Sequence, residues 1–389
     1  MVDIENTKIA FQSKSNQDLR QSHFLFNTLA RPTIVQTGKL FLNIALKTNF
    51  PIKWVVKPTV YKHFCGGETI EECDPVVRNM ARYGVESILD YSVEGKENRE
   101  DIEAALEETL RTIDNAAKNE HIPFAVFKPT AFAKSIVLER ASAGENLSDE
   151  EKQDLNLFRE RINTLCHSAY KNQVPLLIDA EEVCYQNIID EVVRENMKRY
   201  NQEKAIVFNT LQMYRWDRMD FLRKEVDTAR KEGYFFGAKF VRGAYMERER
   251  ERAKRLGYPS PIQPDKESTD RDYNAALRFS VENIDRVAIF NGTHNETSSL
   301  YLVDLMNKYN IAKDDQRVYF SQLYGMSDHI SFNLAHNGYR VAKYLPYGPV
   351  RNVMPYLIRR AEENTAVAGQ TNRELELIKK ELKRRKTNT

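Results

Sequence analysis

The chain has 389 residues, enough for one large α/β domain with extensions or for two to three smaller domains. Its 58 basic and 56 acidic side chains leave a net charge of +2, which gives no reason to expect nucleic-acid binding. Four widely spaced cysteines without a CxxC pair predict reduced thiols and no zinc site. The longest apolar stretch is interrupted by Lys47, Lys53 and Lys57, so no transmembrane helix is expected.

In chain order, residues 1–80 are expected to form a mainly helical N-terminal extension. Residues 81–370 follow as the main domain, and residues 371–389 as a basic, helical C-terminal tail. The first twenty residues mix acids and bases without an apolar core, which does not fit a secretory or transit signal. We therefore expect a cytoplasmic location, in a bacterium.

Eight short apolar runs, rich in β-branched and aromatic residues, recur in the main domain. They are residues 87–92, 124–130, 174–181, 205–212, 235–243, 286–295, 317–325 and 339–348. Segments with helical periodicity lie between them, including 97–118, 182–200, 215–231, 274–283 and 297–309. A helical hairpin is expected between the second and third runs, with a capping box from Ser148 to Glu151. Strand alternating with helix eight times predicts an α/β fold, the (β/α)8 barrel.

Polar side chains stand at the end of each apolar run. They are Asp90, Lys128, Asp179 with Glu181, Asn209 with Gln212, Arg242, Thr293 to Asn295, Gln322, and Tyr344 with Tyr347. In a barrel these ends meet at one mouth, where the active sites of this fold lie. A polar end on one strand would indicate only a strand leaving the core, but eight of them favour a site. Lys128 and Asp179 would be neighbours there, either as a pair that orients substrate or transfers a proton, or as a structural salt bridge.

Residues 344–364 carry the most informative pattern. In a helix, Tyr356, Arg359 and Arg360 stand at i, i+3 and i+4 and project from one face. Two neighbouring guanidinium groups repel one another unless an anion such as a carboxylate or phosphate lies between them. The pattern therefore predicts an anion-binding pair of arginines, with two arginines on a solvated helix surface as the alternative.

Other common sites have no matching motif in this sequence. Neither GxGxxG nor GxxxxGK[ST] is present, so a Rossmann or P-loop nucleotide site is not expected. The seven histidines form no HExxH pattern and no clear cluster with carboxylates, so no metal site is predicted.

Seven blocks of the sequence resemble the proline dehydrogenase family in its monofunctional form. In order, they are LIDAEE (177–182), NTLQ (209–212), AKFVRGAY (238–245), THNE (293–296), QLYGM (322–326), YLPYG (344–348) and YLIRR (356–360). The resemblance implies a distorted barrel that holds FAD non-covalently and oxidises L-proline to Δ1-pyrroline-5-carboxylate by hydride transfer to the flavin. It also implies a membrane quinone as electron acceptor, peripheral attachment to the inner membrane, and a separate pyrroline-5-carboxylate dehydrogenase as a partner in proline catabolism.

The same resemblance assigns roles to individual residues. The catalytic and substrate-binding residues that it implies are Lys128, Asp179, Leu323, Tyr344, Tyr356, Arg359 and Arg360. Arg359 and Arg360 would clamp the proline carboxylate, with Lys128 as a third positive contact. The implied cofactor contacts are Gln212, Lys239, Val241, Arg242, Gly243, Ala244, Tyr245, Thr293, His294, Asn295, Gln322 and Glu363. Glu94 would form an ion pair with Arg359 and gate the site.

Three other functions remain open at this point. In a hydroxyproline dehydrogenase the ring would carry a 4-hydroxyl group, which the phenol of Tyr344 would crowd. A non-catalytic barrel could bind an anion through the arginine pair. A lyase or aldolase could use Lys128 as a Schiff base, although a lysine beside a carboxylate stays mostly protonated.

Overall fold

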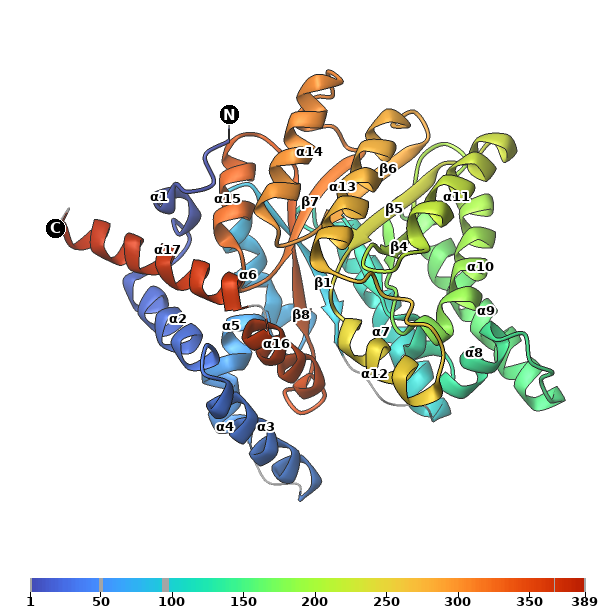
Figure 1. Ribbon diagram of the computed structural model, residues 1–389, viewed down its shortest axis with the longest axis horizontal. Coiled ribbons are helices and arrows are strands. Elements are labelled where there is room, and N and C mark those ends of the chain that lie inside the picture. The colour runs from blue at the N-terminus through green and yellow to red at the C-terminus, as the bar shows by residue number, and fades with distance from the viewer. Residues whose placement is uncertain (1, 49–51, 93–97, 367, 388–389) are drawn as a thin grey trace. The chain divides into compact units, whose positions relative to one another are not determined.

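The computed structural model describes residues 2–48, 52–92, 98–366 and 368–387. The chain consists of two compact units: unit 1 comprises residues 1–94 and 322–389, and unit 2 comprises residues 95–321. The eight strands belong to one sheet, in the order β1-β8-β7-β6-β5-β4-β3-β2. The pairings of β1 with β8 and of β2 through β7 are parallel, and helices connect successive strands (Figure 1). The predicted (β/α)8 fold class is confirmed.

Each strand lies on one of the eight predicted apolar runs. The strands are β1 (Val85–Tyr91), β2 (Ala125–Phe127), β3 (Leu176–Ile178), β4 (Val207–Gln212), β5 (Phe236–Val241), β6 (Val287–Gly292), β7 (Val318–Leu323) and β8 (Val341–Tyr347). Every residue of β4 and of β8 is buried, as expected of parallel strands that are covered on both faces.

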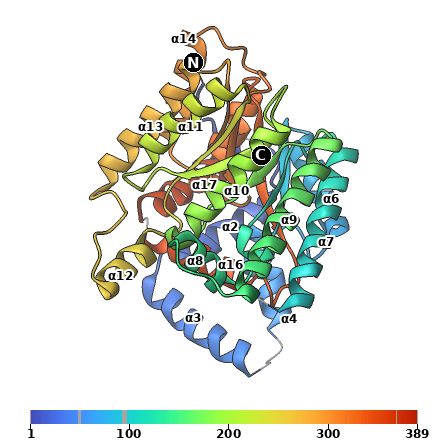
Figure 2. The same ribbon diagram turned by 90° about the vertical axis from the view of Figure 1, so that its right-hand side faces the viewer.

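Unit 2 carries most of the helices that the sequence predicted. They are α7 (Arg99–Lys118), α8 (Ser135–Ser142), α9 (Asp149–Lys171), α10 (Val183–Tyr200), α11 (Arg218–Glu232), α12 (Met246–Leu256), α13 (Lys266–Glu282) and α14 (Glu296–Lys308). Helices α8 and α9 form the expected hairpin, and Ser148 and Glu151 form its capping box. Figure 2 shows α8, α9 and α10 together, and they pack on one another.

Unit 1 combines the two ends of the chain. Its helices are α1 (Thr7–Ala10), α2 (Asn16–Leu29), α3 (Pro32–Lys47), α4 (Lys53–Val56), α5 (Lys62–Phe64), α6 (Ile70–Ala81), α15 (Asp328–His336), α16 (Met354–Ala366) and α17 (Ala368–Thr387). The last helix, α17, packs along α2, where Leu377 and Ile378 share a buried apolar cluster with Leu19 and Phe26 (Figure 1). The predicted tail is thus part of the core of unit 1.

A π-helix, Lys57–Tyr61, joins α4 to α5. Pro58 has no N–H to donate, and the N–H of Lys62 reaches back five residues to the carbonyl of Lys57. The wider turn changes the direction in which the following residues, Lys62 and His63, leave the helix.

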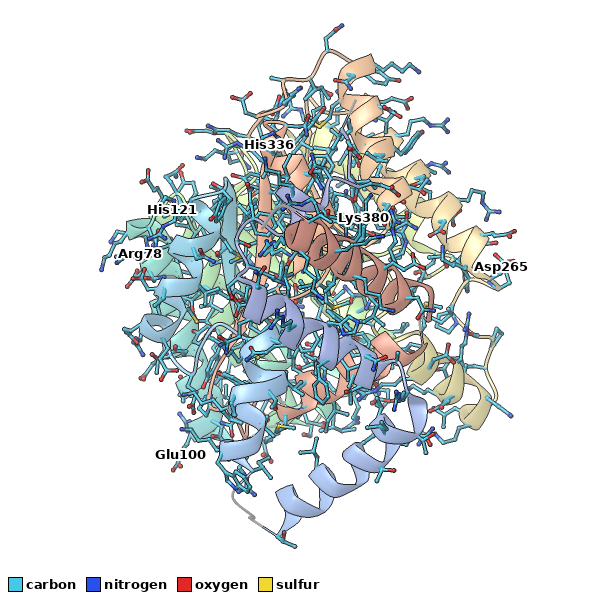
Figure 3. The ribbon with its side chains drawn as sticks, turned by 90° about the vertical axis from the view of Figure 1, so that its left-hand side faces the viewer. Arg78, Glu100, His121, Asp265, His336 and Lys380 are labelled. Carbon is cyan, nitrogen blue, oxygen red and sulfur yellow. The ribbon has the colours of Figure 1, made fainter. Side chains whose placement is uncertain are left out.

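Charged side chains cover the outer helices of both units. Figure 3 shows Arg78 of α6 and Lys380 of α17 in unit 1, and Glu100 of α7 in unit 2, projecting from the ribbon. In the part of the chain that the structure describes, no helix has the length and apolar character needed to cross a membrane.

Candidate active site

In unit 2, Asp179 and Lys239 form a partly buried ion pair across the sheet. Asp179 directly follows β3, and its N–H donates to the carbonyl of Phe127 at the end of β2 (3.0 Å). Lys239 lies in β5, is 5% exposed, and donates a hydrogen bond from Nζ to Asp179 Oδ1. The predicted proximity of the β2 and β3 ends is therefore correct, and the carboxylate of Asp179 has Lys239 as a partner.

Gln212, the last residue of β4, is held by the loop that follows β3. Its Nε2 donates to the carbonyl of Glu181 (2.6 Å), and the carboxylate of Glu181 accepts from the N–H (3.0 Å) and hydroxyl (2.8 Å) of Thr130. These bonds fix the amide plane of Gln212. Its Oε1 is buried and accepts no hydrogen bond from any described residue.

Arg242 follows β5 and is held by the elements next to it. Its guanidinium donates to the hydroxyls of Thr293 (2.6 Å) and Ser298 (2.7 Å) and forms an ion pair with Asp270 (3.1 Å). The guanidinium also lies over the ring of Tyr273, 3.6 Å from its centroid. Burial lowers the pKa of Arg242 from its usual value. The Nε–H is buried and has no acceptor among the described residues.

The backbone after β5 and β6 is open to solvent at the predicted cofactor positions. Gly243 has φ = 96°, and a Cβ there would meet nothing within 4 Å. Ala244 is exposed, and Val241, Tyr245 and His294 are half-buried. Asn295 caps α14, with Oδ1 accepting from the N–H of Ser298 (2.9 Å). These segments leave accessible backbone at the end of the strands.

In unit 1, Leu323 is the last residue of β7, and Tyr344 is the middle residue of β8. Tyr344 lies in β8 opposite Ile88 of β1, is 7% exposed, and accepts from the N–H of Tyr324 at its carbonyl (2.7 Å). Leu323 packs against an apolar cluster that also contains Tyr356. The two residues predicted to wall the substrate ring, Tyr344 and Tyr356, are both largely buried.

Helix α16 presents the predicted arginine pair. Tyr356 and Arg360 are buried, Arg359 is half-buried, and the Arg360 guanidinium lies 5.3 Å from the centroid of the Tyr356 ring. The i, i+3, i+4 spacing thus brings the phenol and the two cations to one side of the helix, as expected. The alternative, an arginine pair that is simply solvated, does not fit the burial of Arg360.

A buried lysine fixes the turn after β7. The Nζ of Lys343, 1% exposed, donates to the carbonyls of Leu323 (3.3 Å) and Met326 (2.6 Å) and forms an ion pair with Asp328 (2.7 Å). Asp328 also pairs with Lys14 (2.6 Å). Burial alone would raise the pKa of Asp328, but the two ammonium groups hold it well below its usual range. This network sets the backbone position of Leu323.

Of the remaining residues that the sequence predicted for the site, the structure describes some and leaves others outside the described part of the chain. Lys128 follows β2 and begins a 3-10 turn, Pro129–Phe132. Gln322 accepts a hydrogen bond from the hydroxyl of Ser331 (2.7 Å) in unit 1. Glu94 lies outside the described residues, and so does the side chain of Glu363. The predicted gate between Glu94 and Arg359 is therefore not tested.

Sequence reasoning missed the residues that hold the predicted ones in place. Asp270 and Ser298 orient Arg242, but they lie inside charged or polar helical segments without a motif. Glu181 was noted at the end of its strand, but its role in positioning Gln212 through its carbonyl was not foreseen. The structural role of Lys343 could not be recognised from the sequence, because Lys343 is a single charged residue within an apolar run.

Two buried polar groups in unit 2 suit a large polar cofactor. Gln212 Oε1 needs a donor and Arg242 Nε needs an acceptor, and unpaired groups of this kind are costly when buried. An isoalloxazine ring offers both an N–H donor and carbonyl acceptors on one edge. The donor and acceptor set at the end of β4 and β5 therefore fits the FAD that the sequence predicted.

Comparison with known proteins assigns this barrel to a family. The architecture is that of a parallel α/β barrel with polar strand ends. A sequence profile of the proline dehydrogenase family matches residues 73–373, and the chain belongs to that family, whose members are oxidoreductases acting on proline.

Three relatives illustrate the range of similar sequences. The carbapenem antibiotics biosynthesis protein CarD of Pectobacterium carotovorum is 36% identical over 322 residues, 83% of either chain. Proline dehydrogenase 1 of Dictyostelium discoideum, a mitochondrial protein, is 31% identical over 99% of this chain and 75% of its own. Hydroxyproline dehydrogenase of Xenopus laevis is 32% identical over 96% of this chain and 88% of its own.

Solved structures of proline utilization A share the fold. The protein of Bdellovibrio bacteriovorus, inactivated by N-propargylglycine, matches with a TM-score of 0.76 and 19% identity over 94% of this chain. A Bradyrhizobium japonicum variant matches with a TM-score of 0.69 and 18% identity over 96% of this chain. The chain spans 42% of the length of each of these two proteins, and at such identity the likeness concerns the fold alone.

Proposed function

We propose that the protein is an FAD-dependent proline dehydrogenase that oxidises L-proline to Δ1-pyrroline-5-carboxylate. The observation that carries the proposal is the set formed by Tyr356, Arg359 and Arg360 on α16, in a chain of the proline dehydrogenase family. A buried guanidinium with a second one a residue away and an aromatic ring beside it suits a small cyclic molecule with one carboxylate.

The arginines bind the substrate carboxylate in this proposal. Arg359 and Arg360 donate charge-assisted hydrogen bonds to its two oxygens, and Lys128 adds a third positive contact. Several fixed contacts on one end of a small molecule define the position of its other end. Such orientation lowers the activation free energy by several kcal/mol, on the order of the gains seen for well-oriented reactants.

Apolar and aromatic groups surround the ring. Leu323, Tyr344 and Tyr356 exclude water from the pyrrolidine ring, and a dry environment favours the neutral amine that must be present when a hydride leaves the neighbouring carbon. Asp179 keeps its carboxylate near the end of β2, and Lys128 is the residue that directly follows this strand.

In this proposal the residues that would hold FAD are those at and after the ends of β4, β5 and β6, together with Gln322 and Glu363. When bound, FAD accepts the hydride that leaves the ring carbon next to the nitrogen. Gln212 Oε1 and Arg242 Nε, which lack partners among the described residues, would hydrogen-bond to the bound cofactor, and the positive charge of Arg242 would stabilise negative charge on it. Lys239, the segment Val241–Tyr245 and the segment Thr293–Asn295 complete the proposed contacts.

The electrons pass on to a membrane quinone in this proposal. The protein then works in the cytoplasm, with peripheral attachment to the inner membrane, and a separate pyrroline-5-carboxylate dehydrogenase uses the product. Glu94 pairs with Arg359 to gate the site. These steps rest on the sequence resemblance and on the family to which the chain belongs.

Replacing Arg359 by lysine tests the substrate clamp. The variant Arg359→Lys keeps one charge but loses the planar fork, so we expect KM for proline to rise about 10- to 100-fold, the loss of one charge-assisted hydrogen bond. Arg78→Lys, on the exposed surface of α6, is the control and should leave KM unchanged. An unaltered KM in Arg359→Lys would remove Arg359 from the clamp.

Hydroxyproline oxidation is the second candidate, because a hydroxyproline dehydrogenase is among the relatives. Tyr344 is buried in β8, and in this proposal its phenol would crowd a 4-hydroxyl group on the ring. We therefore expect kcat/KM to favour L-proline over trans-4-hydroxy-L-proline. The opposite preference would select this second candidate. If neither substrate reduces an artificial electron-accepting dye in the presence of the protein, a non-catalytic anion-binding barrel is favoured instead.

A further inference from the structure

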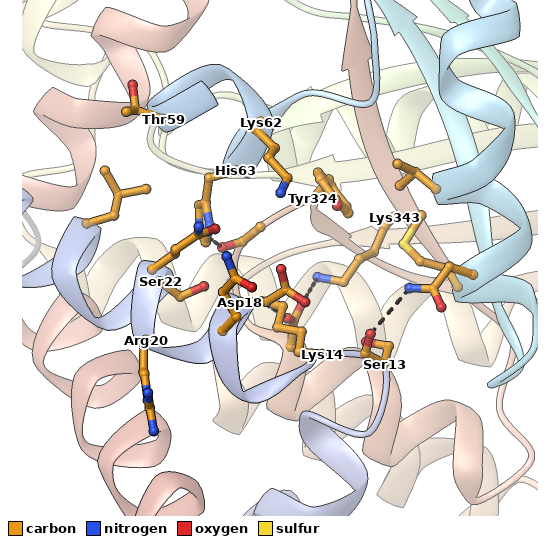
Figure 4. A pocket seen from close by; sticks show the side chains of 18 of the residues that line it. Ser13, Lys14, Asp18, Arg20, Ser22, Thr59, Lys62, His63, Tyr324 and Lys343 are labelled. Atoms are coloured by element: carbon orange, nitrogen blue, oxygen red, sulfur yellow. Dashed lines mark hydrogen bonds and ion pairs between the residues drawn. The ribbon is translucent and has the colours of Figure 1, made fainter. Parts of the chain in front are cut away.

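Unit 1 contains a cavity of about 730 Å³ that no proposed catalytic or cofactor residue lines. It is lined by residues of α2, the π-helix with α5, α6 and α15, and Figure 4 shows it from close by. Its volume lies within the range of cavities that bind small organic molecules. The chemistry of its lining indicates which kind of molecule it suits.

Polar groups without a protein partner face this cavity. Figure 4 shows the ammonium of Lys62 directed into the cavity, on the side where Tyr324 lies. Among the described residues, neither Lys62 Nζ nor the hydroxyl of Tyr324 has a hydrogen-bond partner, although both residues line the cavity. Two donors at one end of a cavity provide a place for an anionic oxygen.

His63 adds a polar group of fixed protonation. Its Nε2 lies 2.9 Å from the carbonyl of Gly325, which can only accept, so Nε2 carries the hydrogen and Nδ1 is an acceptor. Burial, followed by the charge of Lys14, lowers the pKa of His63 to about 3. The ring therefore contributes no charge at neutral pH.

The charges around the cavity sum to a positive value. Four cations (Lys14, Arg20, Lys62 and Lys343) and two carboxylates (Asp18 and Asp328) line it. Asp328 is paired with both Lys14 and Lys343, and Asp18 accepts from Ser15 in the capping box of α2. Lys62 and Arg20 form no ion pair within the described part of the chain, although Lys62 lies close enough to Asp18 to act on its carboxylate electrostatically. An anion is the ligand charge that this balance favours.

Apolar side chains form much of the rest of the wall. Leu25 of α2, Val76 and Met80 of α6, and Phe332 of α15 line the cavity, and Phe24 at its edge is 73% exposed. An exposed aromatic ring beside a cavity is unfavourable in water and gains from covering by an apolar ligand. The cavity therefore combines a cationic end with an apolar body.

The π-helix next to the cavity is a second sign of a site. Pro58 and Thr59 of the π-helix line the cavity, and the wide turn directly precedes Lys62 and His63. Insertions of this kind are rare and frequently occur at functional sites, because they turn side chains away from the ordinary helical direction.

We propose that this cavity is a binding site for an amphipathic monocarboxylate, a molecule with one carboxylate and an aliphatic or aromatic body. The carboxylate accepts hydrogen bonds from Lys62 and Tyr324, and the body packs against Leu25, Val76, Met80 and Phe332. The site is separate from the residues proposed for proline and FAD, so its occupancy is measurable without either.

Calorimetric titration of the full chain with sodium octanoate and sodium decanoate, in the absence of proline, tests the proposal. We expect saturable binding with one site per chain and an affinity that rises about fourfold for each added methylene group. The neutral analogue 1-octanol should bind about tenfold more weakly than octanoate, because it lacks the anion. Proline oxidation plays no part in this readout.

Variants of Lys62 locate the carboxylate. Lys62→Met keeps the aliphatic stem and should weaken decanoate binding about fivefold to tenfold, whereas Lys62→Arg should retain it. Lys379→Met, which removes an exposed cation of α17 away from the cavity, is the matched control. Absence of saturable binding, equal binding by Lys62→Met and Lys379→Met, or indifference to chain length would each overturn the proposal.

Discussion

Arg218 of α11 illustrates how a buried charge is compensated in this protein. Its guanidinium donates to Asp190 of α10 (2.7 Å), and both side chains are 6% exposed. The same carboxylate accepts from the amides of Asn209 (2.9 Å) and Gln186 (2.8 Å). Asn209, which lies within β4, therefore serves the structure of unit 2 by donating to the buried Asp190 carboxylate.

Arg218→Met tests the energetic role of this network. The substitution leaves the Asp190 carboxylate buried with only amide partners, so the free energy of unfolding should fall by about 3 kcal/mol. Arg223→Met removes an exposed i, i+3 partner of Asp220 on the same helix and should change it by less than about 0.5 kcal/mol. Urea denaturation of both variants measures the difference, and equal stabilities would contradict a role for the pair.

His63 gives the stability of the protein a defined pH dependence. Burial and the nearby Lys14 and Lys343 lower its pKa to about 3 from the usual 6.5, against the opposing effect of Asp328. The unfolded chain therefore takes up a proton first as the pH falls below about 6.5, and the folded state is stabilised less and less until about pH 3. Stability from this residue is complete above pH 6.5 and is lost on acidification.

His63→Gln should reduce the pH dependence of unfolding. Glutamine can still donate to the carbonyl of Gly325 but does not titrate. Between pH 6 and pH 4, the slope of the unfolding free energy should decrease by about 1 kcal/mol per pH unit relative to the parent protein. Denaturation at a series of pH values checks this, and an unchanged slope would show that His63 is not held neutral.

At the scale of elements, the turn between β7 and α15 is closely constrained by its neighbours in unit 1. Gly325 has φ = 79°, and a Cβ there would come within 2.3 Å of the carbonyl oxygen of His63. Ser327 is also left-handed, with φ = 51°, and its N–H donates to Glu374 of α17. Helix α17 and α5 thus hold the turn that follows Leu323.

Gly325→Ala should disturb this turn more than a glycine substitution elsewhere. Strain from the positive φ costs roughly 1–2 kcal/mol, and the clash with His63 adds to it. Gly233→Ala has a similar φ of 84° but open space around the new Cβ, so it should show the strain alone. Thermal and urea unfolding compare the two variants, and equal losses of stability would contradict close packing at Gly325.

The sequence predicted the strands better than some of the helices. Helix α15 is buried almost throughout, so it has no amphipathic period to detect. Helix α12 is almost entirely charged, so it shows no apolar stripe. Strand β2 ends at Phe127, earlier than the predicted 124–130, because Pro129 begins a 3-10 turn. The π-helix depends on packing within unit 1 and had no sequence signal beyond Pro58.

The candidate site was predictable where chemistry follows strand order. Asp179, Gln212 and Arg242 each lie directly at a strand end, as the alternating pattern required. The pairing of Asp179 with Lys239 was not foreseen, because Lys239 lies within a strand and reaches across β4. Contacts between elements distant in sequence are set by tertiary packing, which periodicity does not encode.

At the scale of the whole molecule, the proposed function separates into two sets of residues. Unit 2 contains most residues proposed to hold FAD, and unit 1 contains the arginines proposed to hold proline. Changes in unit 2 should therefore affect flavin content, and changes at Arg359 should affect KM for proline in fully loaded protein.

The central claim is tested most directly by the visible absorption spectrum of the purified protein, recorded without oxygen before and after L-proline is added. The account predicts a yellow protein, or one that becomes yellow on reconstitution with FAD, whose flavin absorbance is lost on addition of proline. A protein that cannot be loaded with FAD, or a bound flavin that proline leaves oxidised, would contradict it.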